Sequence, residues 1–137
     1  AYAAVIPKFI EIISKGDQPI IFGDGLQTRD FIHVDDVAKA LLMFSTIPWQ
    51  ERFHHVYNIA TETECSLLDL VQTIQGVFTT IRPEIPLLKP FHKPARLGDI
   101  QRSAASIQRI QNDTQWSPSI AFEDGLREQI LDRLNTK

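Results

Sequence analysis

Two arginines stand in sequence settings that suit the binding of a phosphate. Arg29 follows the turn Gly23–Gly25, and Arg96 follows a proline-rich stretch, with Asp99 three residues further on. A guanidinium group presents its N–H donors as a rigid fork and makes charge-assisted, bidentate hydrogen bonds to phosphate oxygens. A second arginine neutralises a second phosphate, and a carboxylate in the same place accepts hydrogen bonds from ribose hydroxyls.

Each of these settings also has a purely structural interpretation. Arg29 lies next to Asp30 and near Asp35 in the chain. An exposed ion pair with either acid contributes less than about 1 kcal/mol to stability. Arg96 and Asp99 fit a solvated charged loop in the same way. Taken one at a time, neither arginine identifies a binding site.

The remaining reactive side chains do not form a recognisable centre. His33, His54, His55 and His92 are not at metal-ligand spacing with Cys65, so we predict no metal site. His33 is interpreted as a packed or helix-capping residue rather than a general base. The single cysteine cannot form an internal disulfide and fits a reducing compartment, so a cytoplasmic location is expected.

Composition restricts the classes of partner. The chain has 137 residues, of which 43% are hydrophobic and 23% charged, as in an ordinary globular domain. Its net charge of -3 argues against non-specific nucleic-acid binding, which needs a strong cationic field. No apolar stretch reaches the roughly 20 residues of a membrane helix. The first residues show neither an initiator Met nor a signal-peptide pattern, so we expect a fragment of a larger protein that contacts neither nucleic acid nor membrane.

Apolar spacing predicts the helices that must position the arginines. The clearest is 67–78, where Ser66 and Asp69 have the spacing of a capping box. The helix that opens at Asp35 and Asp36 is expected to bury one apolar stripe. That stripe consists of Val37, Ala38, Leu41, Leu42 and Ser45. The other predicted helices cover 5–15, 106–112 and 122–134.

Short β-branched and aromatic runs predict three strands. Segments 19–22 and 29–34 flank the glycine turn and are expected to pair as a hairpin, and 56–59 is a third strand. Four prolines between 81 and 94 exclude a helix and favour an extended segment. The predicted fold is a small mixed α/β domain with about five helices. It lacks the long parallel strands and the G-x-G-x-x-G fingerprint of a Rossmann domain.

Several blocks together resemble a known family. They are VIPKFI, IIFGDGLQTRDFIHVDDVAKA, VYNIATETECSLLDLV, RLGDIQRSAASIQRI, W-S-P and FEDGLREQI. Their order is similar to the C-terminal, substrate-binding half of NAD-dependent nucleotide-sugar epimerases and dehydratases. These are extended short-chain dehydrogenases/reductases, and the resemblance to the UDP-glucose 4-epimerase type covers nearly the whole chain.

The resemblance assigns six substrate-binding residues and no catalytic residue. It implies that Arg29 and Arg96 grip the diphosphate of the substrate and that Asp99 bonds the ribose hydroxyls. The other three, implied to lie near the uracil or thymine ring or along the first helix, are Val5, Ile20 and Phe22.

The resemblance also implies the function. Residues 1–137 would be the nucleotide-sugar-binding C-terminal domain of a 4-epimerase that takes a UDP- or dTDP-sugar and acts by transient oxidation at C4. NAD would be bound by an N-terminal domain, with no cofactor in this fragment, which lacks the family's Tyr-x-x-x-Lys pair and is not catalytically competent alone. The full enzyme is expected to be a homodimer and the fragment a monomer. The alternatives are the same lobe of a 4,6-dehydratase or decarboxylase, or a non-catalytic module that binds a sugar nucleotide or serves as an interaction surface.

Overall fold

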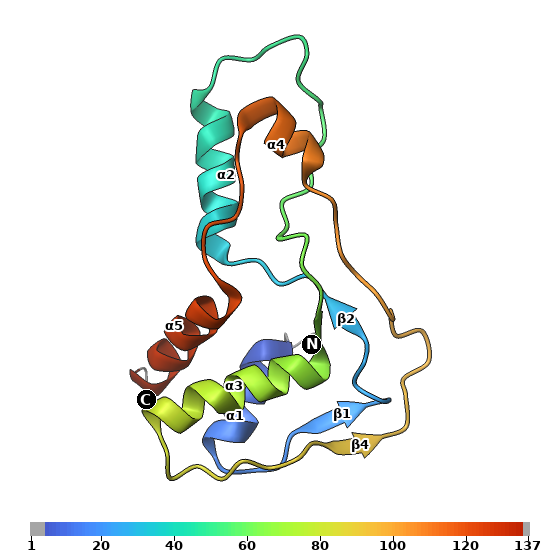
Figure 1. Ribbon diagram of the computed structural model, residues 1–137, viewed down its shortest axis with the longest axis vertical. Helices are drawn as coiled ribbons and strands as arrows, with labels where there is room; N and C mark the ends of the chain where they lie inside the picture. Colours follow the sequence, from blue (N-terminus) through green and yellow to red (C-terminus); the bar gives the residue numbers. More distant parts are fainter. Residues whose placement is uncertain (1–4, 136–137) are drawn as a thin grey trace.

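The computed structural model describes residues 5–135, which form a mixed α/β unit with five helices and four short strands. This confirms the fold class predicted from the sequence. The elements in chain order are α1 (Val5–Ser14), β1 (Ile20–Phe22), β2 (Thr28–Arg29), α2 (Val34–Thr46), β3 (Cys65–Ser66), α3 (Leu67–Ile81), β4 (Phe91–Lys93), α4 (Gln108–Thr114) and α5 (Phe122–Asn135). The molecule is elongated, with α1, α3 and the β1–β4 pair in one half and α2 and α4 in the other (Figure 1).

The strands form two separate pairs of distant segments. β1 pairs in parallel with β4, so that Ile20 lies opposite Phe91. β2 pairs antiparallel with β3, so that Arg29 lies opposite Cys65. The predicted hairpin of 19–22 with 29–34 is therefore wrong, and the second strand ends at Arg29.

The glycine turn explains why the hairpin does not form. Gly23 continues the ladder onto β4, where its N–H donates to the carbonyl of Lys93 at 2.9 Å. The carbonyl of Gly25 accepts a hydrogen bond from the N–H of Leu68 at 3.2 Å, on the first turn of α3. Each strand is paired along one edge with a distant segment, and these contacts direct β1 and β2 to different partners in place of a common ladder.

The third predicted strand, 56–59, is also absent from the described structure. Tyr57 and Ile59 pack against a small apolar cluster, whereas Val56 is 69% exposed. A strand needs a neighbour that accepts and donates its ladder hydrogen bonds. Residues 56–59 belong to neither of the two strand pairs found within residues 5–135, so they have no such neighbour.

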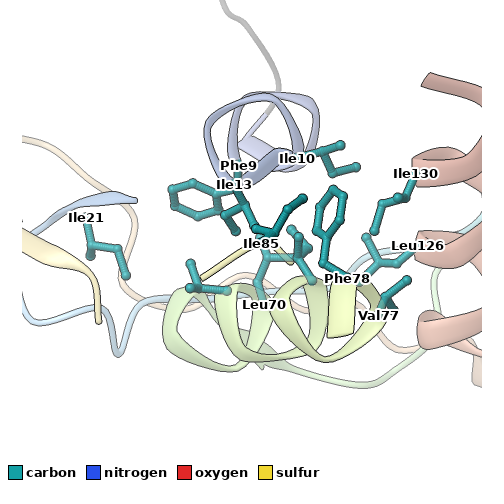
Figure 2. Close-up of a cluster of buried hydrophobic side chains, with 12 residues drawn as sticks. Phe9, Ile10, Ile13, Ile21, Leu70, Val77, Phe78, Ile85, Leu126 and Ile130 are labelled. Carbon is teal, nitrogen blue, oxygen red and sulfur yellow. The ribbon is translucent and has the colours of Figure 1, made fainter. Parts of the chain in front are cut away.

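The main hydrophobic core lies between α1, α3 and α5. Phe78 of α3 reaches toward α1 and lies beside Leu126 of α5 (Figure 2). The helix predicted over 67–78 is confirmed and extends to Ile81. Its buried face, with each side chain at most 2% exposed, consists of Leu70, Val71, Ile74, Val77 and Phe78.

The capping box predicted at the start of α3 is present. The Ser66 hydroxyl accepts a hydrogen bond from the N–H of Asp69 at 3.1 Å, and the Asp69 carboxylate accepts one from the N–H of Ser66 at 3.2 Å. Replacing Ser66 with alanine is expected to lower the free energy of unfolding by about 1 kcal/mol, because a helix N–H loses its partner. Urea denaturation measures this loss. Thr73→Ala, which removes a hydroxyl from the middle of the same helix, is the control and should change stability by less than half as much.

Helix α2 packs differently from the prediction. His33 is its N-cap, as expected, and accepts the N–H of Asp35 at 3.3 Å. The predicted apolar stripe is wrong, because Leu41 and Leu42 are each 66% exposed. The helix instead buries Asp36 and Ala40, one turn apart. Asp36 binds the segment that enters α5, and this polar anchor decides which face of α2 turns inward.

No helix within residues 5–135 combines the length and apolar character needed to cross a membrane. In the same part of the chain, no three His, Cys, Asp or Glu side chains are grouped so as to hold a metal ion.

Candidate functional site

All six residues singled out from the sequence lie around one cavity of about 210 Å³. The cavity is bounded by α1, β1, β2, the start of α3 and the segment after β4. Its lining consists of Val5, Lys8, Phe9, Ile20, Ile21, Phe22, Gln27, Arg29, Leu67, Arg96 and Asp99. The structure therefore brings together residues that are up to 94 positions apart in the sequence, from Val5 to Asp99.

Arg29 is fixed by three acceptors rather than by a neighbouring acid. Its Nη2 bonds Oδ1 of Asp99 at 3.0 Å, and its Nη1 bonds the carbonyls of Thr28 at 2.7 Å and Ile100 at 2.6 Å. The ion pairs with Asp30 or Asp35 that the sequence left open do not occur. A guanidinium has five N–H donors, so the N–H of Nε and one on Nη2 remain unpaired within the described residues. Arg29 is thus held rigidly and keeps donors for an anion.

Asp30 has a separate structural role. Its carboxylate accepts hydrogen bonds from the N–H of Thr61 at 2.9 Å, the hydroxyl of Thr61 at 2.6 Å and the N–H of Glu62 at 3.0 Å. Glu62 has a positive φ of 59°, a conformation in which a local hydrogen bond is valuable. Asp30 therefore stabilises the turn that leads into β3.

Arg96 is held by an aromatic ring. Its guanidinium carbon lies 3.9 Å from the centroid of the Phe22 ring, which is a cation–π contact. Within residues 5–135, its guanidinium makes no hydrogen bond or ion pair. The stack orients a positive charge at the cavity and leaves its donors available.

The segment that carries Arg96 and Asp99 is fastened at both ends. At one end, Gly23 of the glycine turn bonds Lys93 of β4. At the other, the N–H of Thr28 donates to the carbonyl of Gln101 at 2.8 Å. Gly25 makes the intervening turn possible, because its φ is +83° and a Cβ there would lie 2.8 Å from a side-chain carbon of Leu68.

An ion pair reinforces the second fastening point. Glu64 accepts two hydrogen bonds from Arg102 and one from the hydroxyl of Thr28 at 2.6 Å. The bonds from Arg102 first, and the bond from Thr28 second, lower the pKa of Glu64 to about 2. Glu64 is therefore ionised at neutral pH, and it joins three separate segments beside the cavity.

Gln27 is one of the lining residues that the sequence did not indicate, together with Lys8, Phe9, Ile21 and Leu67. It is 4% exposed, and its Nε2 donates to the carbonyl of Phe22 at 2.8 Å and to Oδ2 of Asp99 at 3.3 Å. The signal was present in the sequence, because Gln27 precedes Arg29 by two positions. In an extended chain such residues point to the same side.

Two larger cavities lie elsewhere. One, of about 350 Å³, lies between α5 and residues 31–35, and the other, of about 370 Å³, lies beside Cys65. Burial, followed by the charge of Asp69, raises the pKa of the Cys65 thiol to about 11, which makes it a poor nucleophile. Neither cavity has an arginine in its wall. Charge is therefore a better guide here than size, since of these three cavities, as lined by the described residues, the smallest is the one that combines two guanidinium groups with a carboxylate.

The chemistry of the cavity is that of binding. Lys8, Arg29 and Arg96 supply positive charge and Asp99 supplies one carboxylate, against apolar walls. Among the described residues, those that line the cavity contribute no hydroxyl, thiol or imidazole group. This arrangement defines a class of protein: a small mixed α/β domain whose cavity combines positively charged groups suited to an anion with an apolar wall and a carboxylate.

Comparison with known proteins shows which family the chain resembles. Residues 1–60 match the model of the NAD dependent epimerase/dehydratase family. A putative UDP-glucose 4-epimerase of Methanocaldococcus jannaschii is 35% identical over 129 residues, which cover 93% of this chain and 38% of that protein. The chain is therefore similar in sequence to members of the NAD-dependent epimerase/dehydratase family.

Solved structures of relatives have the same fold. UDP-glucose 4-epimerase of Thermotoga maritima with UDP-glucose superposes with a TM-score of 0.84 at 27% identity, covering 99% of this chain and 41% of that one. UDP-N-acetylglucosamine 4-epimerase of Methanobrevibacter ruminantium, in complex with UDP-N-acetylmuramic acid, gives a TM-score of 0.81 at 33% identity and the same coverage. The chain spans about two fifths of the length of the relatives it matches.

Proposed function

We propose that residues 1–137 form the nucleotide-sugar-binding domain of an NAD-dependent sugar-nucleotide 4-epimerase, as its C-terminal part. The observation that carries this proposal is the convergence of Arg29, Arg96 and Asp99 on one cavity. Two solved structures of relatives are complexes with UDP-sugars, and a 30% identical relative is a dTDP-glucose 4,6-dehydratase, which supports a UDP- or dTDP-sugar as the substrate.

In this proposal, each wall of the cavity contacts one part of the nucleotide. The free donors of Arg29 and Arg96 bind the diphosphate through charge-assisted hydrogen bonds. The acceptor sites that remain on the two carboxylate oxygens of Asp99 accept the ribose hydroxyls. Ile20 and Phe22 lie along the base, and Val5 closes the cavity from α1.

The contribution of this domain to the reaction is positioning. Binding energy from the nucleotide, which does not react, orients the sugar for chemistry at C4. When bound, NAD supplies transient oxidation and return of a hydride at that carbon. The residues described here do not fit NAD, because the glycines at 23 and 25 lead into strand β2 and not into a helix N-terminus that would hold a pyrophosphate. The proposal therefore places NAD on a part of the enzyme outside this chain.

The first test is titration of the chain with UDP, dTDP and GDP by calorimetry. Arg96→Ala is expected to lower the affinity for the nucleotide that binds by about tenfold, because one charge-assisted contact is lost. Arg109→Ala, which removes an exposed arginine on α4 away from the cavity, is the charge-matched control and should change affinity less than twofold. Equal effects of the two variants would contradict the assignment of this cavity.

A relative with a different activity supports decarboxylation as a second candidate reaction. The UDP-N-acetyl-alpha-D-glucosaminuronate decarboxylase of Bacillus cytotoxicus is 30% identical over 132 residues. Under this alternative, the same lobe serves a decarboxylase or a dehydratase. Incubating the full-length enzyme with UDP-glucose and with UDP-glucuronic acid separates the reactions, since only a 4-epimerase returns products of unchanged mass.

A further inference from the structure

Gln27 bridges two walls of the candidate site. Its amide nitrogen contacts the carbonyl of Phe22 in β1 at 2.8 Å and Oδ2 of Asp99 in the segment after β4 at 3.3 Å. Phe22 and Asp99 are 77 positions apart in the sequence. The side chain of Gln27, which directly precedes β2, holds the two segments at a fixed distance from each other. At 4% exposure, the bridge is shielded from competing water.

Fold stability does not by itself account for an amide at this position. The Oε1 atom of Gln27 is buried and has no hydrogen-bond partner within residues 5–135. Leaving a buried acceptor unpaired is unfavourable. The bond to Asp99 offers a functional reason for the amide.

The Asp99 carboxylate is held on both oxygens. Arg29 bonds Oδ1 and Gln27 bonds Oδ2, so the plane of the carboxylate cannot rotate freely about its side-chain bond. Each carboxylate oxygen accepts about two hydrogen bonds, so each keeps one acceptor site. A pair of fixed acceptor sites matches two neighbouring hydroxyl groups, as on a ribose.

We propose that Gln27 is a positioning residue that orients Asp99 toward the ribose of the nucleotide. This inference rests on the proposed function and goes beyond it, because it assigns selectivity for the nucleoside over the diphosphate to a residue that does not itself contact phosphate. Without Gln27, Arg29 alone holds Asp99 by one oxygen, and the carboxylate turns away from the geometry that a diol requires.

The test compares Gln27→Met with Gln75→Met. Gln75 also donates its amide to a backbone carbonyl, that of Leu88 at 2.7 Å, but it lies on α3 outside the cavity. Calorimetric titration with UDP, and competition with inorganic pyrophosphate, separate nucleoside recognition from anion binding. Gln27→Met is expected to lower the affinity for UDP about tenfold and the affinity for pyrophosphate less than twofold. Gln75→Met is expected to change neither.

A double-mutant cycle with Asp99→Ala shows whether Gln27 acts through Asp99. In the Asp99→Ala background, Gln27→Met is expected to lower the affinity for UDP by less than twofold. The inference is wrong if Gln27→Met lowers the affinities for UDP and pyrophosphate by the same factor. It is also wrong if Gln27→Met lowers the affinity for UDP equally with and without Asp99. In either case Gln27 has a merely structural role. Should Gln27→Met fail to fold, Gln27→Asn, whose amide is one methylene too short to bridge, takes its place in the cycle.

This experiment also separates the inference from the proposed function. If the unchanged chain binds UDP and Gln27→Met does so equally well, only the role of Gln27 is refuted. If the unchanged chain binds none of UDP, dTDP and GDP, the proposed function is contradicted and the inference, which depends on it, is refuted as well.

Discussion

Asp36→Asn is expected to lower the free energy of unfolding by about 3 kcal/mol, because it leaves a buried hydrogen-bond network without its charge. The Asp36 side chain is 1% exposed. Its Oδ2 accepts the N–H groups of Ser119 and Ile120, each at 3.0 Å, and its Oδ1 accepts the Ser119 hydroxyl at 2.8 Å. In asparagine, an NH2 group replaces one of the two oxygens. This group is itself a donor, and it faces the donor groups of Ser119 and Ile120.

The matched control is Asp35→Asn. Asp35 precedes Asp36 on the same helix turn, carries the same charge, and its side chain is 61% exposed. Both variants lose one negative charge near the helix N-terminus, which contributes less than about 1 kcal/mol. Urea denaturation of both variants therefore isolates the network. Equal losses for Asp35→Asn and Asp36→Asn would show that the helix dipole, not the buried network, is the source of the stability.

The same network predicts how stability depends on pH. Burial alone would raise the pKa of Asp36, but the hydrogen bonds from Ile120, Ser119 and Lys39 outweigh burial and lower this pKa from 3.8 to about 2. Since the folded state has the lower pKa, the contribution is complete above about pH 4 and is lost as the pH falls toward 2, a loss of about 2 kcal/mol. The difference in unfolding free energy between the parent and Asp36→Asn should shrink over this range. A difference that stays constant from pH 5 to pH 2.5 would contradict the lowered pKa.

Arg29→Ala is expected to reduce nucleotide affinity at least 100-fold, a larger loss than that of Arg96→Ala. The two arginines differ in how they are held. Arg29 is bonded to three acceptors and is 28% exposed, so its free donors are already oriented when a ligand arrives. Arg96 is held over the Phe22 ring by a cation–π contact alone, so its N–H donors are less firmly oriented before a ligand binds.

Arg29→Lys distinguishes geometry from charge at this position. Lysine keeps the positive charge but not the planar fork, so it cannot hold Asp99 and Ile100 while also binding a phosphate. We expect Arg29→Lys to lose nearly as much affinity as Arg29→Ala, measured by calorimetry with UDP and with Arg109→Ala as the control. If lysine restores most of the affinity, Arg29 acts as a simple charge and its anchoring contacts are unimportant for binding.

Local sequence patterns predicted the structure correctly wherever the interactions that stabilise a segment lie within that segment. The capping box at Ser66 and the apolar face of α3 depend only on residues within a few turns, and both are present as predicted. The glycine turn and the cap at His33 are equally local. For the site, the types of residue and the order of the motifs pointed to Arg29 and Arg96 before any geometry was known.

The errors all concern pairing between distant segments. The hairpin of β1 with β2 was plausible by proximity in the chain, yet each strand pairs with a partner more than 30 residues away, as Ile20 does with Phe91 and Arg29 with Cys65. The inward face of α2 is decided by the bonds of Asp36 to Ser119 and Ile120, which no helical periodicity contains.

The sequence by itself determined the fold class, the helices and the residue types suited to a diphosphate and a ribose. Only the tertiary structure decided that Arg29 bonds Asp99 and not Asp30, that Arg96 lies on Phe22, and that Gln27 bridges two walls of the cavity. The physical reason is range. Propensity, capping and periodicity act within about a turn of helix or strand, whereas a binding site is made of contacts that exist only after distant segments have packed together.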